Sequence, residues 1–280
     1  MSTKTLVTGV TGQVGAALLR VLDGHEVLAA DRTALDLADP DSIVAALRSA
    51  RPEVVLNPAA FTSVDGAEEQ PQLAHAINAE APGILAQEAR RLGALLVHYS
   101  TDYVFDGSLR RPYVESDVAH PLSVYGKSKL EGEARVRASG CRHAILRTSW
   151  VYGGRTNFPM LIVEKAKKNE ALRVVADQTG VPTWAADLAR LTREVIRKDA
   201  LGTWHASAGG EVTRYAYAVE VLRLAGIAAS VEPIATSQFP SPAQRPAYSA
   251  LDSSALERET GIPAIGPWRE RLAAYLGGAA

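Results

Sequence analysis

The chain has 280 residues, of which 47% are hydrophobic and 22% charged, and its formal net charge is -1. This composition is typical of a globular protein with a sizeable core, and the near-zero charge excludes a general attraction to nucleic acid or anionic membranes. The single cysteine, Cys141, excludes an internal disulfide, and we recognise no signal peptide or membrane-spanning stretch, so we expect a cytoplasmic protein.

Through about residue 150, short apolar runs alternate with longer amphipathic stretches. Continuous apolar strands separated by helices indicate a parallel sheet that is covered on both faces. The predicted fold class is therefore α/β, with a doubly wound, Rossmann-type parallel sheet. Strands are predicted at 5–8, 26–30, 53–57, 94–100 and 143–149, and helices at 12–22, 40–50, 78–92 and 124–139.

After residue 150 the pattern loosens. The proline- and serine-rich stretch 233–249 is compatible with a disordered linker, but the helix-compatible segment and Trp268 that follow it favour a rigid loop that covers the substrate. We expect residues 1–150 to form a dinucleotide-binding domain that carries the catalytic residues. Residues 151–280 are expected to form mainly a smaller α/β substrate-binding domain, with some segments returning to the Rossmann core. Helices are predicted near 156–169, 184–198, 212–225 and 266–276, and short strands at 172–175 and 231–234.

A glycine-rich turn, with Gly9, Gly12 and Gly15, lies between the first predicted strand and the first predicted helix. Glycines allow a tight turn and a close approach of the backbone to a pyrophosphate, and the N–H groups at a helix start attract negative charge. Glycines alone are a weak signal, but the strand–turn–helix context is the one that dinucleotide binding requires. We therefore predict that this turn binds a nicotinamide dinucleotide.

The second predicted strand ends at Asp31, and Arg32 follows it directly. A carboxylate at this position can accept hydrogen bonds from the adenosine ribose, which favours NADH, whereas an arginine can hold the 2′-phosphate of NADPH. The two residues favour different cofactors, so both NADH and NADPH stay open, with NADPH slightly favoured. Asp36 and Leu37 are candidates to flank the adenine.

The catalytic candidates are Tyr125 and Lys129, which stand four residues apart at the start of a predicted helix and so share one helical face. Reduction of a ketone by hydride leaves an oxyanion that must gain a proton, and a free tyrosine has a pKa near ~10. We expect the ammonium to lower the pKa of the phenol and to hold the nicotinamide ribose. Thr101, just past the fourth strand, is placed to hydrogen-bond the substrate carbonyl.

Seven segments carry a family resemblance that spans nearly the whole chain. They are TGVTGQVG (8–15), NPAAFTSVDGAE (57–68), HYSTDYVFDG (98–107), VYGKSK (124–129), RTSWVYG (147–153), DQTGVPT (177–183) and SPAQRPAYSALD (241–252). With these segments the chain resembles the extended short-chain dehydrogenase/reductases and, within them, the dTDP-4-dehydrorhamnose reductase family. The early motifs specify only the superfamily, whereas STDYVFDG, RTSWVYG and DQTGVPT are narrower.

The resemblance implies that NAD(P)H delivers hydride to the 4-keto carbon of dTDP-6-deoxy-L-lyxo-4-hexulose, which gives dTDP-L-rhamnose. It implies that Tyr125 supplies the proton, that Lys129 assists, and that Thr101 positions the carbonyl. Carried over by position, it also implies a set of binding residues. These are Gly12, Gln13 and Val14 for the pyrophosphate, Asp31, Asp36 and Leu37 for the adenosine, Ala60, Phe61, Thr62 and Tyr99 for the dinucleotide groove, Asp102 and Trp150 for the sugar, and Arg245 for the substrate phosphates.

One departure from the family concerns magnesium. Some members bind it at a dimer interface through acidic side chains, where this chain has Ala17 and Ala186. Alanine cannot ligate a hard cation, so we expect no metal site and a monomer or weak homodimer.

Three alternatives concern the reaction. The first is a nucleotide-sugar 4,6-dehydratase or epimerase on the same fold, but those dehydratases typically have Asp-Glu after the active-site threonine, whereas here Asp102 is followed by Tyr103. Another nucleotide-sugar 4-ketoreductase, for instance one that forms 6-deoxy-talose, stays open. So does a non-catalytic, NADP-binding regulatory subunit on the same fold, although retention of the three catalytic candidates argues against it.

Overall fold

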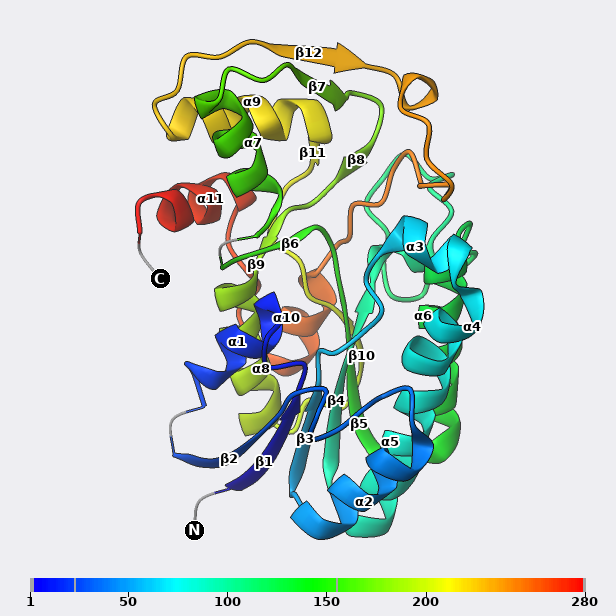
Figure 1. Cartoon of the computed structure of the whole chain (residues 1–280). Helices are drawn as coiled ribbons and strands as arrows, with labels where there is room; N and C mark the ends of the chain where they lie inside the picture. Colours follow the sequence, from blue (N-terminus) through cyan, green and yellow to red (C-terminus); the bar gives the residue numbers. More distant parts are fainter. Residues whose placement is uncertain (1–2, 23, 155, 279–280) are drawn as a thin grey trace.

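The computed structural model describes residues 3–22, 24–154 and 156–278, and its centre is a sheet of six parallel strands (Figure 1). The strand order is β10-β5-β4-β3-β1-β2. The chain places β2 on one side of β1, and then crosses to the other side of β1 to form β3, β4 and β5 in turn. The predicted doubly wound α/β fold is confirmed. The strands are β1 (Thr3–Thr8), β2 (His25–Ala30), β3 (Val54–Asn57), β4 (Leu95–Thr101), β5 (Arg142–Thr148) and β10 (Gly202–His205).

Alternate residues of the strands feed two separate cores, because successive side chains of a strand point to opposite faces. Leu96 packs in the core beneath α2 (Pro40–Ala50), α5 (Ala81–Leu92) and α6 (Val124–Ser139). Its neighbour Val97 packs in the other core, beneath α1 (Gln13–Leu19) and α8 (Ala185–Arg197). Each fully buried side chain of this kind contributes ~1.5–3 kcal/mol, so both layers stabilise the sheet.

Two predicted helices of the first half of the chain differ from the structure at their ends. The helix predicted at 12–22 ends at Leu19, because its last turn tightens into i→i−3 bonds from Arg20 to Ala17 and from Val21 to Leu18. The helix predicted at 78–92 is preceded by a π-helical turn, η1 (Ala76–Glu80), that continues into α5. Pro82 has no N–H to complete the regular ladder there.

The sixth strand, β10, was not predicted, although it pairs in parallel with β5 at the sheet edge. It has only four residues and begins at Gly202, whose φ is +125°, so it lacks a recognisable apolar run. Three short helices were also not predicted. These are α3 (Val64–Glu69), α4 (Pro71–His75) and α10 (Ser254–Thr260).

Most of the second half of the chain builds the upper part of the molecule in Figure 1, whereas α8, β10 and α10 lie with the large sheet. In the upper part β7 and β12 pair in parallel beside α9, and β8 pairs with β11. Two-residue strands β6 and β9 pair where the parts join. The bounds are β6 (Val151–Tyr152), α7 (Phe158–Lys167), β7 (Leu172–Val175), β8 (Thr179–Gly180), β9 (Thr183–Trp184), β11 (Val212–Thr213), α9 (Arg214–Leu224), β12 (Val231–Ile234), η3 (Thr236–Gln238) and α11 (Trp268–Leu276).

The topology brings several strand ends to one edge of the sheet. The order reverses between β1 and β3, and the carboxyl ends of β1, β3, β4 and β5 lie side by side there. Ligands of open α/β sheets bind at such a switch point. Within the described ranges, no helix combines the length and the apolar character needed to cross a bilayer.

Candidate active site

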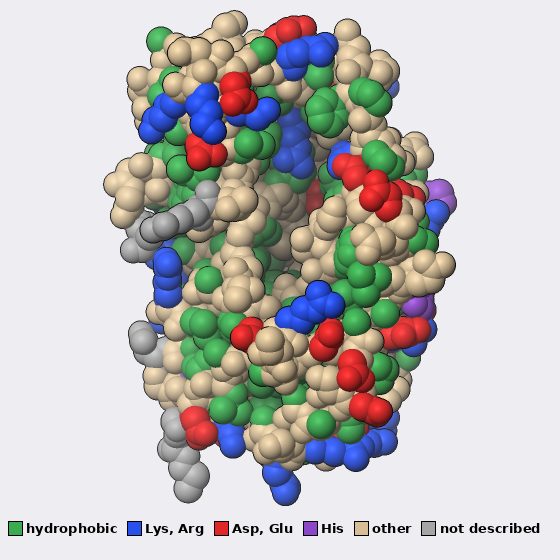
Figure 2. All heavy atoms as spheres, in the orientation of Figure 1, with side chains coloured by type: hydrophobic (Ala, Val, Ile, Leu, Met, Phe, Trp, Pro, Cys, Tyr) green, Lys and Arg blue, Asp and Glu red, His purple; other side chains and the backbone are tan. Residues whose placement is uncertain are grey.

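A cleft of about 620 Å³ lies at this edge, between the two parts of the molecule. Figure 2 shows a hollow there, with basic and acidic side chains visible inside it. Its size suits a small-molecule ligand. The lining comes from the glycine turn, the segments after β3, β4 and β5, and the starts of α6 and α9, and it includes Gly9, Gly12, Gln13, Val14, Gly15, Ala60, Thr62, Tyr99, Thr101, Asp102, Tyr125, Lys129, Trp150 and Arg214.

The glycine turn has the close packing that its sequence predicts. Gly9 has a φ of +56°, which is a left-handed conformation that favours glycine, and a Cβ there would lie 2.9 Å from Cα of Ala59. A Cβ at Gly15 would overlap the carbonyl of Gly9. Helix α1 begins directly after this turn, and the buried Oε1 of Gln13 has no partner among the described residues. The turn therefore forms a cradle of backbone and an unsatisfied side chain.

The residues predicted to hold the adenosine gather after β2, outside the cleft lining. Oδ1 of Asp31 accepts from the backbone N–H and the hydroxyl of Thr33, at 2.9 and 2.6 Å, and the hydroxyl bond lowers the pKa of the Asp31 carboxyl. Arg32 is exposed, and its guanidinium lies 3.6 Å from the Asp36 carboxylate. The side chain of Leu37 is buried in the core. Asp31 is thus already used as the cap of its own turn.

Thr101 and Tyr125 meet at the end of β4. Ser123 caps α6 by accepting from the N–H of Gly126 at 3.1 Å, and a Cβ at Gly126 would overlap the carbonyl of Tyr103. This close packing seats Tyr125 beside the turn η2 (Asp102–Val104). Thr101 caps that turn, because its Oγ1 accepts from the N–H of Tyr103 at 3.1 Å, and its hydroxyl donates to Oδ1 of Asp102 at 3.0 Å.

The structure does not show the lowered Tyr125 pKa that the Lys129 ammonium was expected to produce. Burial in the cleft wall raises the pKa of the phenol above its usual value, and the Thr101 hydroxyl is the neighbour that lowers it. The sequence pattern contains the Tyr–Lys spacing but not the burial, and burial disfavours the phenolate. Tyr125 therefore keeps its proton at neutral pH, which is the state that a proton donor requires.

Lys129 is almost completely buried, one helical turn beyond Tyr125. Its Nζ donates to the carbonyl of Tyr99 at 2.6 Å and lies 3.4 Å from Nε2 of His98. Burial lowers the pKa of Lys129 to about 8, and the nearby Glu133 carboxylate opposes that change. Lys129 also lines the cleft, and at neutral pH it is predominantly an ammonium.

Asp102 is buried at the cleft wall. Its Oδ2 accepts from the hydroxyl of Ser249 at 2.6 Å, and burial raises the pKa of Asp102 to about 6. Ser249 was not predicted as a site residue, because it is 147 positions away in the chain and no local pattern links it to Asp102.

Trp150 and Arg214 form an aromatic and cationic wall. Trp150 has a φ of +41°, which is an unusual conformation for a bulky residue. Its indole packs closely on Gly180, where a Cβ would lie 2.6 Å from Cε2 of the Trp150 ring. The Arg214 guanidinium carbon lies 3.8 Å from the centre of the Trp150 ring, in the geometry of a cation–π contact. Arg214 was not predicted. Its only sequence signal is a basic residue after Thr213, the N-cap of α9.

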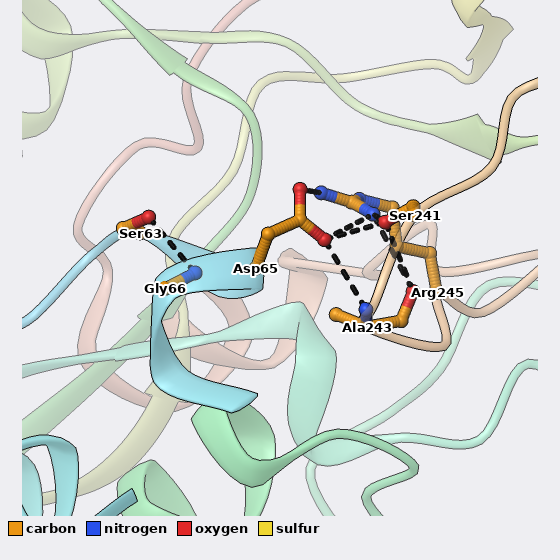
Figure 3. Close-up of polar contacts among 6 residues, drawn as sticks. All are labelled: Ser63, Asp65, Gly66, Ser241, Ala243 and Arg245. Atoms are coloured by element: carbon orange, nitrogen blue, oxygen red, sulfur yellow. Dashed lines mark hydrogen bonds and ion pairs between the residues drawn. The ribbon is translucent and has the colours of Figure 1, made fainter. Parts of the chain in front are cut away.

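Arg245 is tied to α3 and does not itself line the cleft, although it neighbours the lining residue Tyr103 (Figure 3). Its Nη2 lies 2.7 Å from Oδ2 of Asp65, and this contact lowers the pKa of Asp65 to about 2. Oδ1 of Asp65 also accepts from the Ser241 hydroxyl and from the N–H of Ala243. Within the described part of the chain, by contrast, no carboxylate lies within 4.0 Å of the Arg214 guanidinium.

The structure thus brings most, but not all, of the predicted site residues into one cleft. Phe61 stays outside the lining, because the Asn78 side chain binds its N–H and carbonyl, at 2.9 and 3.0 Å. Ala17 and Ala186 pack against the same core. Among the described residues, no three His, Cys, Asp or Glu side chains are grouped as metal ligands. The predicted residues outside the cleft lining are Asp31, Arg32, Asp36, Leu37, Phe61 and Arg245.

Comparison with known proteins gives a consistent result. Residues 3–279 match the model of a family described as RmlD substrate binding domain. The chain is 39% identical to a dTDP-4-dehydrorhamnose reductase of Burkholderia thailandensis, with 95% of each chain covered. It is 41% identical to a probable dTDP-4,6-dihydroxy-2-methyloxan-3-one 4-ketoreductase of Streptomyces antibioticus, covering 95% of this chain and 92% of that one. A dTDP-4-dehydrorhamnose reductase of Bacillus anthracis, solved in complex with NADP, superposes with a TM-score of 0.96 at 32% identity, over 99% of this chain and 100% of that one.

Proposed function

We propose a function on the premise that this chain belongs to the dTDP-4-dehydrorhamnose reductase family, an NAD(P)H-dependent branch of the extended short-chain dehydrogenase/reductases. Its reaction is reduction of the 4-keto group of dTDP-6-deoxy-L-lyxo-4-hexulose to give dTDP-L-rhamnose. The observation that carries this proposal is that Thr101, Tyr125 and Lys129 line the same cleft as the glycine turn.

The cradle of the glycine turn suits a dinucleotide, because it offers backbone N–H groups and the unpartnered Gln13 at a helix start. Gly9, Gly12, Val14 and Gly15 would hold the pyrophosphate there with Gln13. Ala60, Thr62 and Tyr99 would line the dinucleotide groove, with Phe61 behind it. When bound, the cofactor supplies the hydride.

Tyr125 acts as the proton donor in this proposal. Its phenol is protonated at neutral pH because burial raises its pKa, so it is ready to neutralise an alkoxide. The Lys129 ammonium stabilises the phenolate that remains and holds the nicotinamide ribose. Thr101 donates to the carbonyl oxygen, which requires its hydroxyl to leave Asp102 as substrate enters.

The sugar is proposed to lie between Asp102 and Trp150, with residues 151–280 supplying most of the substrate side and residues 1–150 the cofactor side. We expect a cytoplasmic monomer or weak homodimer. The decisive experiment is NMR analysis of the product formed from the 4-keto nucleotide sugar and NADPH. A rhamnose configuration of the product supports the proposal, and a talose configuration assigns a different 4-ketoreductase. The Streptomyces relative is named as a probable 4-ketoreductase of another dTDP-linked substrate. Cofactor binding without turnover assigns a regulatory subunit.

Arg32 is the proposed determinant of cofactor preference, because it is exposed beside Asp31 at the end of β2. Arg32→Ala is expected to lower the ratio of kcat/KM with NADPH to that with NADH by about tenfold, through loss of a charged contact to the 2′-phosphate. Steady-state kinetics with both cofactors measure this ratio. Arg20→Ala, which changes an exposed arginine at the end of α1, is the control. An unchanged ratio in Arg32→Ala would remove Arg32 from the cofactor site.

The substrate phosphates are proposed to contact Arg214, with Arg245 as a second clamp that Asp65 holds in place. The Arg214 charge has no close carboxylate among the described residues, so its removal is expected to weaken binding of the substrate phosphates more than removal of the Arg245 charge. Arg214→Ala should weaken inhibition by dTDP by about tenfold or more, and inhibition by thymidine much less. The NADPH Kd should stay within a few fold. Equal weakening for both inhibitors would mean that Arg214 only supports Trp150.

A further inference from the structure

His98 is a buried histidine that the proposed reaction leaves without a role. It lies in the middle of β4 with no exposed surface, and its Nε2 is 3.4 Å from Nζ of Lys129. An ammonium has three donors and no acceptor, so a buried lysine needs acceptors around it. Among the described residues, the hydrogen-bond acceptors on Nζ are the Tyr99 carbonyl and this imidazole.

The other side of the imidazole continues into a buried polar chain. Nδ1 of His98 lies 3.2 Å from the side-chain amide nitrogen of Asn57, at the end of β3. The amide oxygen of Asn57 lies 2.8 Å from the hydroxyl of Thr8, which ends β1 and directly precedes Gly9. Thr8, Asn57, His98 and Lys129 thus connect four elements beneath the floor of the cleft. All four side chains are at most 2% exposed.

Hydrogen-bond chemistry decides how this chain must be arranged. While Lys129 carries its extra proton, Nε2 of His98 must be an acceptor, so Nδ1 must carry the imidazole proton. That N–H then requires the amide oxygen of Asn57, so the amide group is flipped relative to the structure, where its nitrogen faces Nδ1 and its oxygen faces Thr8. When Lys129 is a neutral amine, the arrangement reverses, and Nδ1 accepts from Asn57. Rotation of one buried amide therefore lets the chain serve both protonation states of Lys129.

We propose that His98 is a positioning residue for Lys129, and that Asn57 and Thr8 set the tautomer with which its neutral imidazole holds the ammonium. This inference rests on the role proposed above for Lys129. Burial and the adjacent Lys129 charge keep the pKa of His98 well below its usual value, so the ring is neutral over the working pH range. A neutral ring can accept a hydrogen bond from the Lys129 ammonium and places no second positive charge beside it.

The other groups that face Lys129 do not replace this contact. Glu133 follows one turn later on α6, but its carboxylate accepts from Arg147 at 2.9 and 2.7 Å and from the Ser100 hydroxyl at 2.5 Å. Tyr125 lies on the cleft side, and Tyr99 offers only its carbonyl. His98 is therefore the side chain that can change its hydrogen-bonding state together with Lys129.

The test compares His98→Met with His98→Gln. Methionine fills a similar space without a comparable acceptor, whereas the glutamine Oε1 can reach the position of Nε2. NADPH Kd is measured by fluorescence titration from about pH 6 to pH 10, together with kcat and KM. His98→Met is expected to weaken NADPH binding about tenfold at pH 7 and to move the alkaline loss of binding down by about one pH unit, because the ammonium loses an acceptor. His98→Gln is expected to restore the NADPH Kd to within about threefold of the wild-type value. It should also return the alkaline loss of binding to within a few tenths of a pH unit of the wild-type position.

His205 provides a matched control. It is an equally buried histidine of the same sheet, and its Nδ1 lies 3.0 Å from the Tyr113 carbonyl, away from Lys129. His205→Met is expected to lower the Tm without moving the pH dependence of NADPH binding. If His98→Met and His205→Met give the same pH dependence, or His98→Gln restores nothing, His98 only fills space and the inference is overturned.

Nitrogen NMR of the wild-type protein tests the tautomer without any variant at this position. Near pH 6.5 the proton is expected on Nδ1 of His98, both with and without NADPH, and a proton on Nε2 would overturn the inference even if the variants do not fold. Lys129→Met separates a failure of the proposed function from a failure of the role assigned to His98. Unchanged binding and turnover in that variant would refute the proposed function itself. Impaired Lys129→Met with an unaltered pH dependence in His98→Met would refute only the role of His98.

Discussion

Tyr125→Phe is expected to lower turnover by about 10²-fold or more while it leaves the Kd for NADPH within a few fold. The substitution removes only the phenol oxygen, so the ring keeps its edge-on packing against Tyr103, with centroids 6.1 Å apart. Without that oxygen, the alkoxide formed from the ketone has no positioned acid. Single-turnover kinetics with saturating NADPH, alongside cofactor titration, measure the two quantities separately.

Tyr103→Phe is the matched control, because it removes a hydroxyl from the neighbouring ring in the same cleft. Burial raises the pKa of Tyr103 as well, so pKa alone does not distinguish the two phenols. The distinction is positional, since the Thr101 hydroxyl lies against Tyr125. Because the Tyr103 hydroxyl neighbours Arg214, the two variants are compared at saturating substrate. Near-normal turnover in Tyr125→Phe, or an equal loss of the single-turnover rate in Tyr103→Phe, would refute the assignment of the acid.

The fold was largely predictable because its signals are local. Each strand of the first half is a run of apolar residues long enough to be recognised, and alternate residues such as Leu96 and Val97 feed the two cores. The edge strand β10 was not predictable in this way. Its four residues acquire strand geometry by pairing with β5, which is more than fifty residues earlier.

The site follows the same division between local and distant relationships. The spacing of Tyr125 and Lys129 on one helical face is a local property, and both residues line the cleft. The contact between Arg245 and Asp65 joins residues 180 positions apart, and the one between Ser249 and Asp102 joins residues 147 apart. The expected lowering of the Tyr125 pKa is absent for a related reason, since burial depends on the whole fold.

Lys129→Met is expected to weaken NADPH binding by about 10²-fold and to lower turnover by a similar factor, because one ammonium serves both the ribose and the phenolate. The pH dependence gives the sharper test. The pKa of Lys129 is lowered to about 8, so the ammonium is present below that pH and is lost as the pH rises through it. Wild-type kcat/KM should therefore fall above about pH 8, and the residual activity of Lys129→Met should lack this decline.

Lys127→Met is the control for this variant. Lys127 lies two residues earlier on α6, and its side chain is exposed rather than buried. Loss of an exposed ammonium should change activity by less than about twofold and leave the alkaline decline in place. If Lys129→Met retains the wild-type decline, another group titrates there, and the cleft uses its buried lysine only to hold the Tyr99 carbonyl. Because Lys129 also contacts His98, the same pH series on His98→Met tests whether the floor of the cleft sets the position of that decline.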